Sequence, residues 1–146
     1  LTGIRTPLNR PDLTGRLSGL HPGVTPAMLA YATMEGVAFQ FADCLAAQQA
    51  VGVRPERFTV VGGGTRSRLW LRLLATALGQ PVGLIDGADM AGPQGAARLA
   101  AVAAGAPVST LGLPIPITET IDPDETLARA LAPRRAMVAR LAENPA

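Results

Sequence analysis

The stretch Val60-Val61-Gly62-Gly63-Gly64-Thr65-Arg66-Ser67 decides the fold prediction. A short apolar segment rich in β-branched residues, 58–61, leads into three glycines and then into a segment with helical periodicity, residues 67–78. This order predicts a buried strand, a tight turn and a helix N-terminus. The unpaired N–H groups and partial positive charge of such a helix end suit a phosphate or another polar ligand, and glycines let a ligand approach the backbone.

The neighbouring segments alternate between helical and extended patterns. Thr25-Pro26 is a good helix start, because Thr caps an N-terminus and Pro fits the first helical position, and the helical pattern continues to about Val51. A second strand is predicted over residues 81–85 and a third helix over residues 93–104. This alternation of helices and short strands indicates an α/β layer structure.

The two ends of the chain give weaker signals. Residues 1–23 contain many prolines and glycines and predict loop, with one short strand near residues 16–20. Residues 106–120 are also predicted as loop, since they contain three prolines. Asp122-Pro123-Asp124-Glu125 has the pattern of a capping box and predicts a helix that Pro133 interrupts.

The composition excludes several classes of protein. The chain has 146 residues, the size of one domain, and 48% are apolar, enough for a real core. All 13 basic residues are Arg and lie scattered, and aromatic residues make up 3%, which argues against nucleic-acid binding. The single cysteine, Cys44, excludes an intrachain disulfide and fits a reducing cytoplasm. No apolar run reaches the roughly 18 residues of a membrane span, and no signal peptide is visible.

The glycine turn permits more than one interpretation. Three glycines can simply make a tight strand-to-helix turn. Gly62-x-Gly64-x-x-Ser67, with Asp86 after the next strand, also approaches a dinucleotide-binding fingerprint. Ser67 replaces the third glycine of that fingerprint, and a long helix precedes the strand, so the match is incomplete. A Walker-A phosphate loop is excluded because the chain contains no lysine.

Four stretches, in order, resemble the carbohydrate kinases of the glycerol kinase and xylulokinase group. Residues 2–7 resemble the Gly-Glu-Arg-Thr-Pro stretch of xylulokinases, and residues 15–35 resemble the family's C-terminal signature. Residues 60–70 are similar to its adenosine motif. Residues 92–97 are similar to the helix that closes its second actin-like domain. The likeness covers nearly the whole chain.

The resemblance implies a ribonuclease H-like, actin-like ATPase fold. Residues 1–146 would form the C-terminal half of the second domain of a sugar kinase, the N-terminal domain being absent. The start of the chain, which is not Met and lies inside a loop, fits this expectation. The implied activity is ATP-dependent phosphorylation of a sugar, most directly D-xylulose to D-xylulose 5-phosphate, with Mg²⁺. The chain alone is expected to be inactive.

The resemblance also assigns roles to residues. Gly62, Gly63 and Gly64 would lie against the adenosine and phosphates of ATP, and Ser67 near the adenine edge. The base, an Asp, lies upstream of this chain in the family, so no catalytic residue and no metal ligand is assigned here. The sugar would bind mainly to the missing N-terminal domain. Neither a nucleic acid nor a membrane is an expected partner, and a homodimer of the full-length protein is left open.

Two positions depart from the family's pattern and leave the sugar open. Ile4 stands where xylulokinases usually have Glu, and Met28 stands where the signature expects a polar residue. A dinucleotide-binding, Rossmann-like domain of an oxidoreductase and a non-catalytic actin-like module are the alternatives.

Among other residues, Glu35 is expected to bond to backbone or to an Arg, because a buried acid needs such a partner. The small residues 95–97 are expected at a close crossing of two elements.

Overall fold

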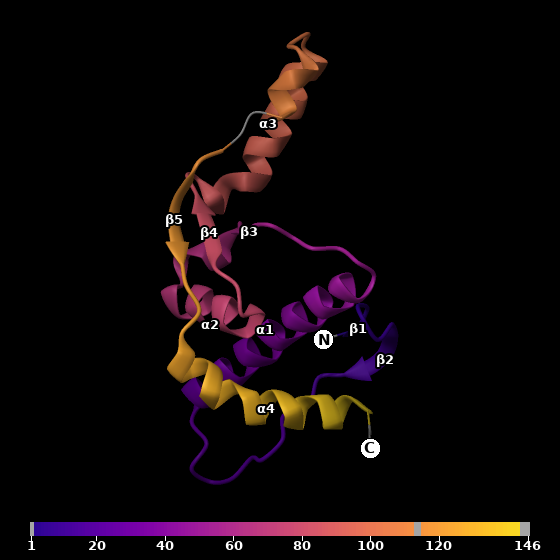
Figure 1. Ribbon diagram of the computed structural model, residues 1–146, viewed down its shortest axis with the longest axis vertical. Helices are drawn as coiled ribbons and strands as arrows, with labels where there is room; N and C mark the ends of the chain where they lie inside the picture. Colours follow the sequence, from indigo (N-terminus) through magenta and orange to yellow (C-terminus); the bar gives the residue numbers. More distant parts are fainter. Residues whose placement is uncertain (1, 113–114, 144–146) are drawn as a thin grey trace.

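The computed structural model describes residues 2–112 and 115–143 of the chain. Two small sheets and four α-helices are present in this part, joined by three short 3-10 helices marked η, and the predicted α/β class is confirmed (Figure 1). In chain order the elements are β1 (Thr2–Ile4), β2 (Arg10–Thr14), α1 (Pro26–Ala50), β3 (Phe58–Val60), η1 (Gly63–Arg66), α2 (Arg68–Leu78), β4 (Val82–Ile85), η2 (Ala88–Met90), α3 (Ala91–Ala103), η3 (Val108–Gly112), β5 (Ile117–Ile121) and α4 (Glu125–Glu143).

The larger sheet has the order β3-β4-β5 and determines where the site lies. β3 pairs in parallel with β4, with Phe58 opposite Val82, and β5 pairs antiparallel on the other side of β4, with Ile121 opposite Val82. The central position of β4 explains why Val82 is fully buried. Because β3 and β4 are parallel, their carboxyl ends meet at one edge, and the turns η1 and η2 follow there side by side.

β5 corrects the prediction of loop over residues 106–120. Its residues Ile117–Ile121 alternate between half-buried and exposed side chains, as expected for a strand with one face on the protein. Pro116 precedes the strand and β5 lies at the edge of the sheet, where a nearby proline removes no ladder hydrogen bond. The prolines therefore delimit this strand rather than exclude it.

The core lies where α1 packs against α2 and α4. Its buried centre consists of Ala38, Phe39, Leu73 and Leu131. Helical spacing in the sequence favours a face of α1 with Met34, Val37, Phe41, Cys44, Leu45 and Gln48. This prediction was right in part: Leu45 is buried and Met34 packs against the core, but Val37 and Phe41 are 43% and 49% exposed. Apolar residues occur all round this helix, so periodicity alone did not separate the buried face from its neighbours. The side chains of α1 that are buried are Glu35, Ala38, Phe39, Ala42 and Leu45.

Both predicted helix starts are confirmed at the atomic level. The Thr25 hydroxyl accepts a hydrogen bond from the Met28 N–H at 3.3 Å, and Pro26 is the first residue of α1. The Ser67 hydroxyl accepts from the Trp70 N–H at 3.2 Å, so Ser67 is the N-cap of α2. α2 therefore begins directly at the end of the glycine turn.

α4 differs from its prediction in two ways. The helix runs through Pro133 without interruption, and its capping oxygen belongs to Asp124, whose Oδ1 accepts from the Leu127 N–H at 2.8 Å. Leu131, before the proline, is buried in the core, and Arg134, after it, pairs with α1. These tertiary contacts on both sides of Pro133 offset the roughly 3 kcal/mol that a proline costs inside a helix.

The ends of the fold project from this core. β1 and β2 form an antiparallel hairpin. The short strand predicted near residues 16–20 was wrong, because these residues follow β2 and form no strand. α3 extends away from α1, α2 and α4 (Figure 1), and none of its residues is buried by the described chain. The close crossing expected for residues 95–97 is therefore not formed within the described residues, where Gly95, Ala96 and Ala97 are exposed.

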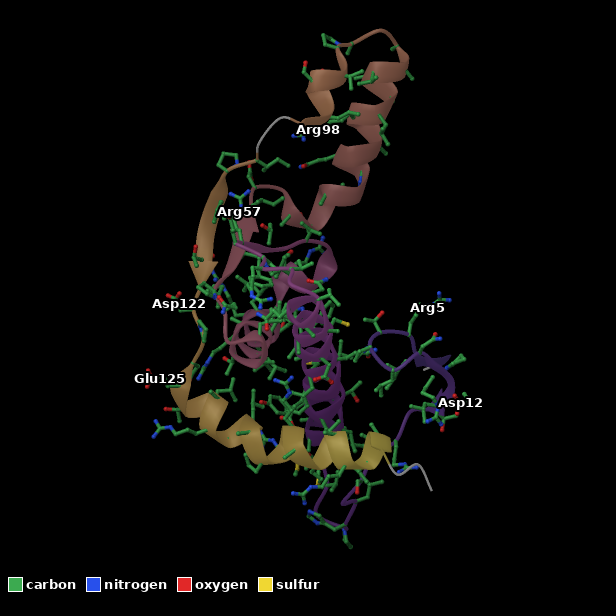
Figure 2. All side chains as sticks on the ribbon, turned by 45° about the vertical axis from the view of Figure 1, so that its right-hand side comes forward. Arg5, Asp12, Arg57, Arg98, Asp122 and Glu125 are labelled. Atoms are coloured by element: carbon green, nitrogen blue, oxygen red, sulfur yellow. The ribbon has the colours of Figure 1, made fainter. Side chains whose placement is uncertain are left out.

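Charged side chains lie mostly on the outside. Figure 2 shows Arg5 and Asp12 pointing outward from the hairpin and Glu125 outward from the start of α4, while side chains crowd between α1, α2 and the larger sheet. In the part of the chain that the structure describes, no helix is both long enough and apolar enough to cross a membrane.

Candidate functional site

The candidate site lies at the carboxyl ends of β3 and β4. The glycine turn, residues 62–64, follows β3, and residues 86–90 follow β4. Since the two strands are parallel neighbours, both segments reach the same edge, which is where open α/β sheets bind their ligands. The N-terminus of α2 opens at the same place and adds unpaired N–H groups.

Gly62 holds a backbone conformation that only glycine adopts readily. Its φ of 89° and ψ of −176° lie in a region that other residues avoid. This conformation directs the Gly62 N–H to the Ala88 carbonyl of η2 at 2.7 Å, and the Gly62 carbonyl accepts from the Thr65 hydroxyl at 2.8 Å. The sharp turn is therefore bonded both within itself and to the next loop.

The three glycines have different surroundings. A Cβ built on Gly62 or Gly63 would meet no atom of the described residues within 4 Å, so this side of the turn is open. A Cβ on Gly64 would lie 3.0 Å from Cδ1 of Trp70, so Gly64 instead makes room for the indole ring. The open backbone at Gly62 and Gly63 is thus the part that a ligand can approach.

Ser67 completes the turn. Its N–H donates to the Gly64 carbonyl at 3.1 Å, and its hydroxyl caps α2. The structure therefore brings all four predicted nucleotide-binding residues, Gly62, Gly63, Gly64 and Ser67, into one continuous turn. The observed bonds of Ser67 are those of a helix cap; a contact with an adenine edge stays a prediction.

An ion pair joins the two loops of the site. Arg66 Nη2, at the end of η1, donates to Asp89 Oδ2 in η2 at 2.8 Å, and Nε donates to the same oxygen at 3.3 Å. These hydrogen bonds lower the pKa of Asp89, so its carboxylate stays ionised at neutral pH. The sequence places Asp86 and Asp89 after a strand end, where they could face a ligand or cap the next turn, and Asp86 was also the acid of the dinucleotide alternative. In the structure Asp86 is exposed. The ion pair could have been expected from parallel pairing, which places the ends of consecutive strands together.

Two further ion pairs hold α2 against the rest of the chain. Arg68 pairs with Glu119 of β5, and Arg72 pairs with Asp124 at the start of α4. The hydrogen bond from Arg68 lowers the pKa of Glu119, while the backbone N–H of Leu127 is the main cause that lowers the pKa of Asp124. The first half of the helix whose N-terminus opens at the site is thus linked to β5 and to the start of α4.

Residues 1–104 match the FGGY family of carbohydrate kinases, C-terminal domain. The chain belongs to this family. The match includes both strands, both turns and the helix N-terminus that form the candidate site. The chain is therefore part of a family of phosphotransferases, and the dinucleotide-binding alternative has no support.

Relatives and solved structures agree with this FGGY assignment. The chain is 38% identical over 143 residues to a xylulose kinase of Escherichia coli, covering 97% of this chain and 30% of that enzyme. It is 39% identical over 106 residues to a glycerol kinase of Citrifermentans bemidjiense, covering 72% and 21%. The crystal structure of a "xyloylose kinase" from Brucella ovis matches with a TM-score of 0.80 and 37% identity, covering 96% of this chain and 29% of that one. The predicted actin-like fold is confirmed, and the chain spans about 30% of the length of the E. coli enzyme.

Glu35 of the FGGY chain has the partner that the sequence predicted. Its Oε1 accepts from Arg134 Nε on α4 at 2.9 Å, and its side chain is 9% exposed. Burial raises the pKa of Glu35, and the nearby positive charge of Arg134 opposes this effect. The pair connects α1 to α4, away from the glycine turn, so it belongs to the packing of the helices rather than to the site.

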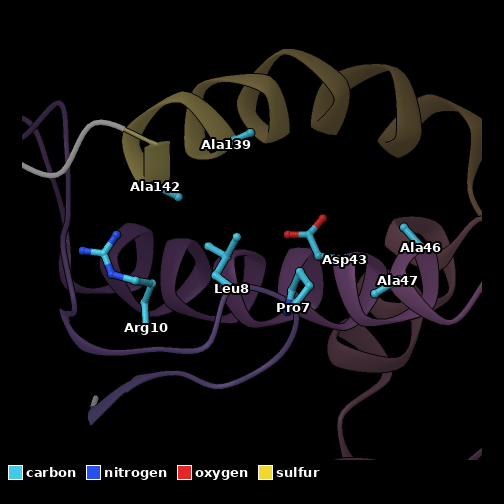
Figure 3. A pocket seen from close by; sticks show the side chains of 8 residues that line it. All are labelled: Pro7, Leu8, Arg10, Asp43, Ala46, Ala47, Ala139 and Ala142. Atoms are coloured by element: carbon cyan, nitrogen blue, oxygen red, sulfur yellow. The ribbon is translucent and has the colours of Figure 1, made fainter. Parts of the chain in front are cut away.

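A cavity of about 560 Å³ opens on another part of the FGGY chain, between the hairpin, α1 and α4 (Figure 3). Its wall is mostly apolar and includes Leu8 and four alanines, with Asp43 and Arg10 beside them. None of its lining residues comes from η1, η2 or α2, so it is separate from the candidate site. Its lining residues are Pro7, Leu8, Arg10, Asp43, Ala46, Ala47, Ala139 and Ala142.

The candidate site presents open glycine backbone and the N-terminus of α2. Among the described residues, no three His, Cys, Asp or Glu side chains gather in a way that could hold a metal ion. The open glycine backbone beside the α2 N-terminus instead fits a flat base and an anionic phosphate chain.

Proposed function

We propose that this chain is the ATP-binding, C-terminal part of a longer sugar kinase and is inactive alone. The observation that carries the proposal is the open backbone at Gly62 and Gly63, at the carboxyl ends of β3 and β4 and beside the N-terminus of α2. The chain's 30% share of the length of the E. coli xylulose kinase supports the view that the rest of the enzyme lies outside it.

The residues of this chain would bind and orient the nucleotide. Gly62 and Gly63 would lie against ATP without a side chain between them, and the free N–H groups at the start of α2 would attract its negative charge. Bound ATP supplies the γ-phosphoryl group, and Mg²⁺ accompanies its phosphates. We assign neither a base nor a magnesium ligand to this chain; the resemblance places the base upstream.

The proposed sugar is D-xylulose. The xylulose kinase of E. coli matches 97% of this chain, whereas the glycerol kinase of C. bemidjiense matches 72% at a similar identity. Ile4 departs from the xylulokinase pattern but belongs to the hairpin, apart from the glycine turn. The sugar itself would bind mainly to the part of the kinase outside this chain.

A phosphoryl-transfer assay on the complete kinase tests this proposal. ATP and Mg²⁺ are supplied with D-xylulose, glycerol or D-gluconate in turn, and ADP production is measured. We expect turnover with D-xylulose and none from the 146-residue chain alone. Turnover with glycerol but not D-xylulose would overturn the proposed sugar and leave a kinase. No turnover with any sugar would contradict the kinase proposal and favour a non-catalytic actin-like module.

A further inference from the structure

The segment from Gly62 to Arg66, which contains the glycine turn, is attached to η2 at both of its ends. At its start, the Gly62 N–H donates to the Ala88 carbonyl at 2.7 Å. At its end, Arg66 donates two hydrogen bonds to Asp89, at 2.8 and 3.3 Å. Ala88 and Asp89 are consecutive residues of η2, so one short segment holds both ends of the turn.

The residues between these two attachments are the ones that a nucleotide would approach. Gly63 and Gly64 are exposed, and the backbone at Gly63 is open. Glycines have the greatest conformational freedom of all residues, so an unattached turn of this composition would sample many conformations. Attachment at both ends reduces the number of conformations open to it, and a binding site that is already ordered loses less entropy when its ligand binds.

The segment η2 is itself well placed to serve as the anchor. Gly87, just before it, has a φ of 62°, and its carbonyl accepts a hydrogen bond from the Met90 N–H at 2.8 Å, which closes the turn of η2. Ala88 is buried. Asp89 is 33% exposed as a side chain, while Arg66 is 74% exposed. The Asp89 side chain is therefore the more ordered member of the pair, and it restrains the more exposed Arg66 side chain.

We propose that Arg66 and Asp89 are positioning residues that hold the glycine turn in its ATP-binding conformation. This inference rests on the proposed function. Neither residue needs to touch the reacting atoms, because the pair acts through the backbone of residues 62–64. Loss of the pair should weaken ATP binding and leave the chemical step and the sugar site nearly unchanged.

The expected effect is modest because the pair is exposed. Exposed ion pairs contribute little, so removal of this one should raise the KM for ATP roughly two- to fivefold. The KM for the sugar and the kcat should change less than twofold, and the melting temperature should change little. A purely structural pair would affect both substrates alike.

Four variants of the complete kinase test the inference. Arg66→Ala removes the ion pair and its hydrogen bonds, Asp89→Asn removes the negative charge, and the double exchange Arg66→Asp with Asp89→Arg restores opposite charges in reversed order. Arg135→Ala is the matched control, since it removes the Arg135–Asp43 pair, which has the same 2.8 Å distance and joins α4 to α1. Initial rates are measured against ATP at saturating sugar and against sugar at saturating ATP, and each variant is melted.

We expect Arg66→Ala and Asp89→Asn to raise the KM for ATP alone, the exchange to recover at least half of that loss, and Arg135→Ala to behave as the wild type. An active wild type whose KM for ATP is unchanged in both single variants would overturn the inference and leave the proposed function standing. So would an equal rise in both KM values, or a fall in kcat alone. A wild type without ATP-dependent transfer would overturn the proposed function, and the inference with it.

Discussion

Glu35 on α1 and Arg134 on α4 form a pair that satisfies only one of the two carboxylate oxygens. Arg134 Nε donates to Oε1 at 2.9 Å, while Oε2 is buried and has no hydrogen-bond partner among the described residues. A buried oxygen without a donor favours the protonated form of the acid. The arginine therefore stabilises the charge that burial opposes, and burial has the larger effect on the pKa of Glu35.

This arrangement predicts an unusual pH dependence. The pKa of Glu35 in the folded chain lies above its ordinary value of 4.5, so its contribution favours folding most below that pH and is lost as the pH rises through the folded pKa. Glu35→Gln cannot titrate. The free energy of unfolding of the wild type, minus that of Glu35→Gln, should therefore fall as the pH rises above the ordinary value of 4.5, measured by urea unfolding.

The comparison with Glu35→Gln removes the effect of the other acids. Hydrogen bonds with arginines lower the pKa of Asp12, to about 2, and the pKa of Asp89. Such groups favour folding above their ordinary pKa values and lose that contribution as the pH falls, but both variants contain them. A stability difference that stays constant or grows with pH would contradict the account of Glu35.

Removal of Arg134 should cost more than removal of its neighbour Arg135. Arg134→Ala leaves the buried Glu35 carboxylate without a partner, which should lower the free energy of unfolding by about 1–3 kcal/mol. Arg135→Ala removes a pair with Asp43 in which both side chains are at least 40% exposed, and should cost no more than about 1 kcal/mol. Equal losses in urea unfolding at pH 7 would show that burial of Glu35 does not matter.

Gly62 and Gly63 should respond differently to the same change. Gly62→Ala forces a side chain onto a backbone with a φ of 89°, and should cost about 1–3 kcal/mol of stability. Gly63 has no positive φ and open space at its Cβ, so Gly63→Ala should change stability by less than about 0.5 kcal/mol. Thermal unfolding of both variants measures this, and a Gly63→Ala loss as large as that of Gly62→Ala would contradict the described turn.

Two phenylalanines on α1 test the corrected position of the core. Phe39 is 2% exposed and belongs to the buried cluster, so Phe39→Ala should lower the free energy of unfolding by about 3–5 kcal/mol. Phe41 is 49% exposed and meets Trp70 edge to face at 6.3 Å, so Phe41→Ala should cost no more than about 1.5 kcal/mol. Urea unfolding that shows the larger loss at Phe41 would restore the face that periodicity suggested.

The sequence predicted the part of the fold that forms the site. Strand β3, the glycine turn, helix α2 and strand β4 follow from local signals, because their glycines, cap residue and short apolar runs act over a few positions. The predicted helix start at residue 67 falls on the N-cap, Ser67. The four residues assigned to the nucleotide accordingly lie together.

The parts that were missed depend on distant contacts. From the sequence alone, Pro133 predicts the end of a helix. The contact of Arg134 with Glu35, which supports the continuous helix, joins two residues far apart in the chain. β5 lies beside prolines and forms only because β4 offers it an edge. Arg66 and Asp89 are 23 positions apart, and only the parallel pairing of β3 and β4 brings them together. Local sequence signals do not contain this information.

The most direct test of the ATP-binding role is an amide-resolved NMR titration of the chain with Mg-ATP and, separately, with NAD. The account predicts that Mg-ATP shifts the amide signals of Gly62, Gly63, Gly64 and Ser67, and that NAD leaves them in place. Shifts of these amides with NAD and none with Mg-ATP would contradict the account and assign the turn to a dinucleotide.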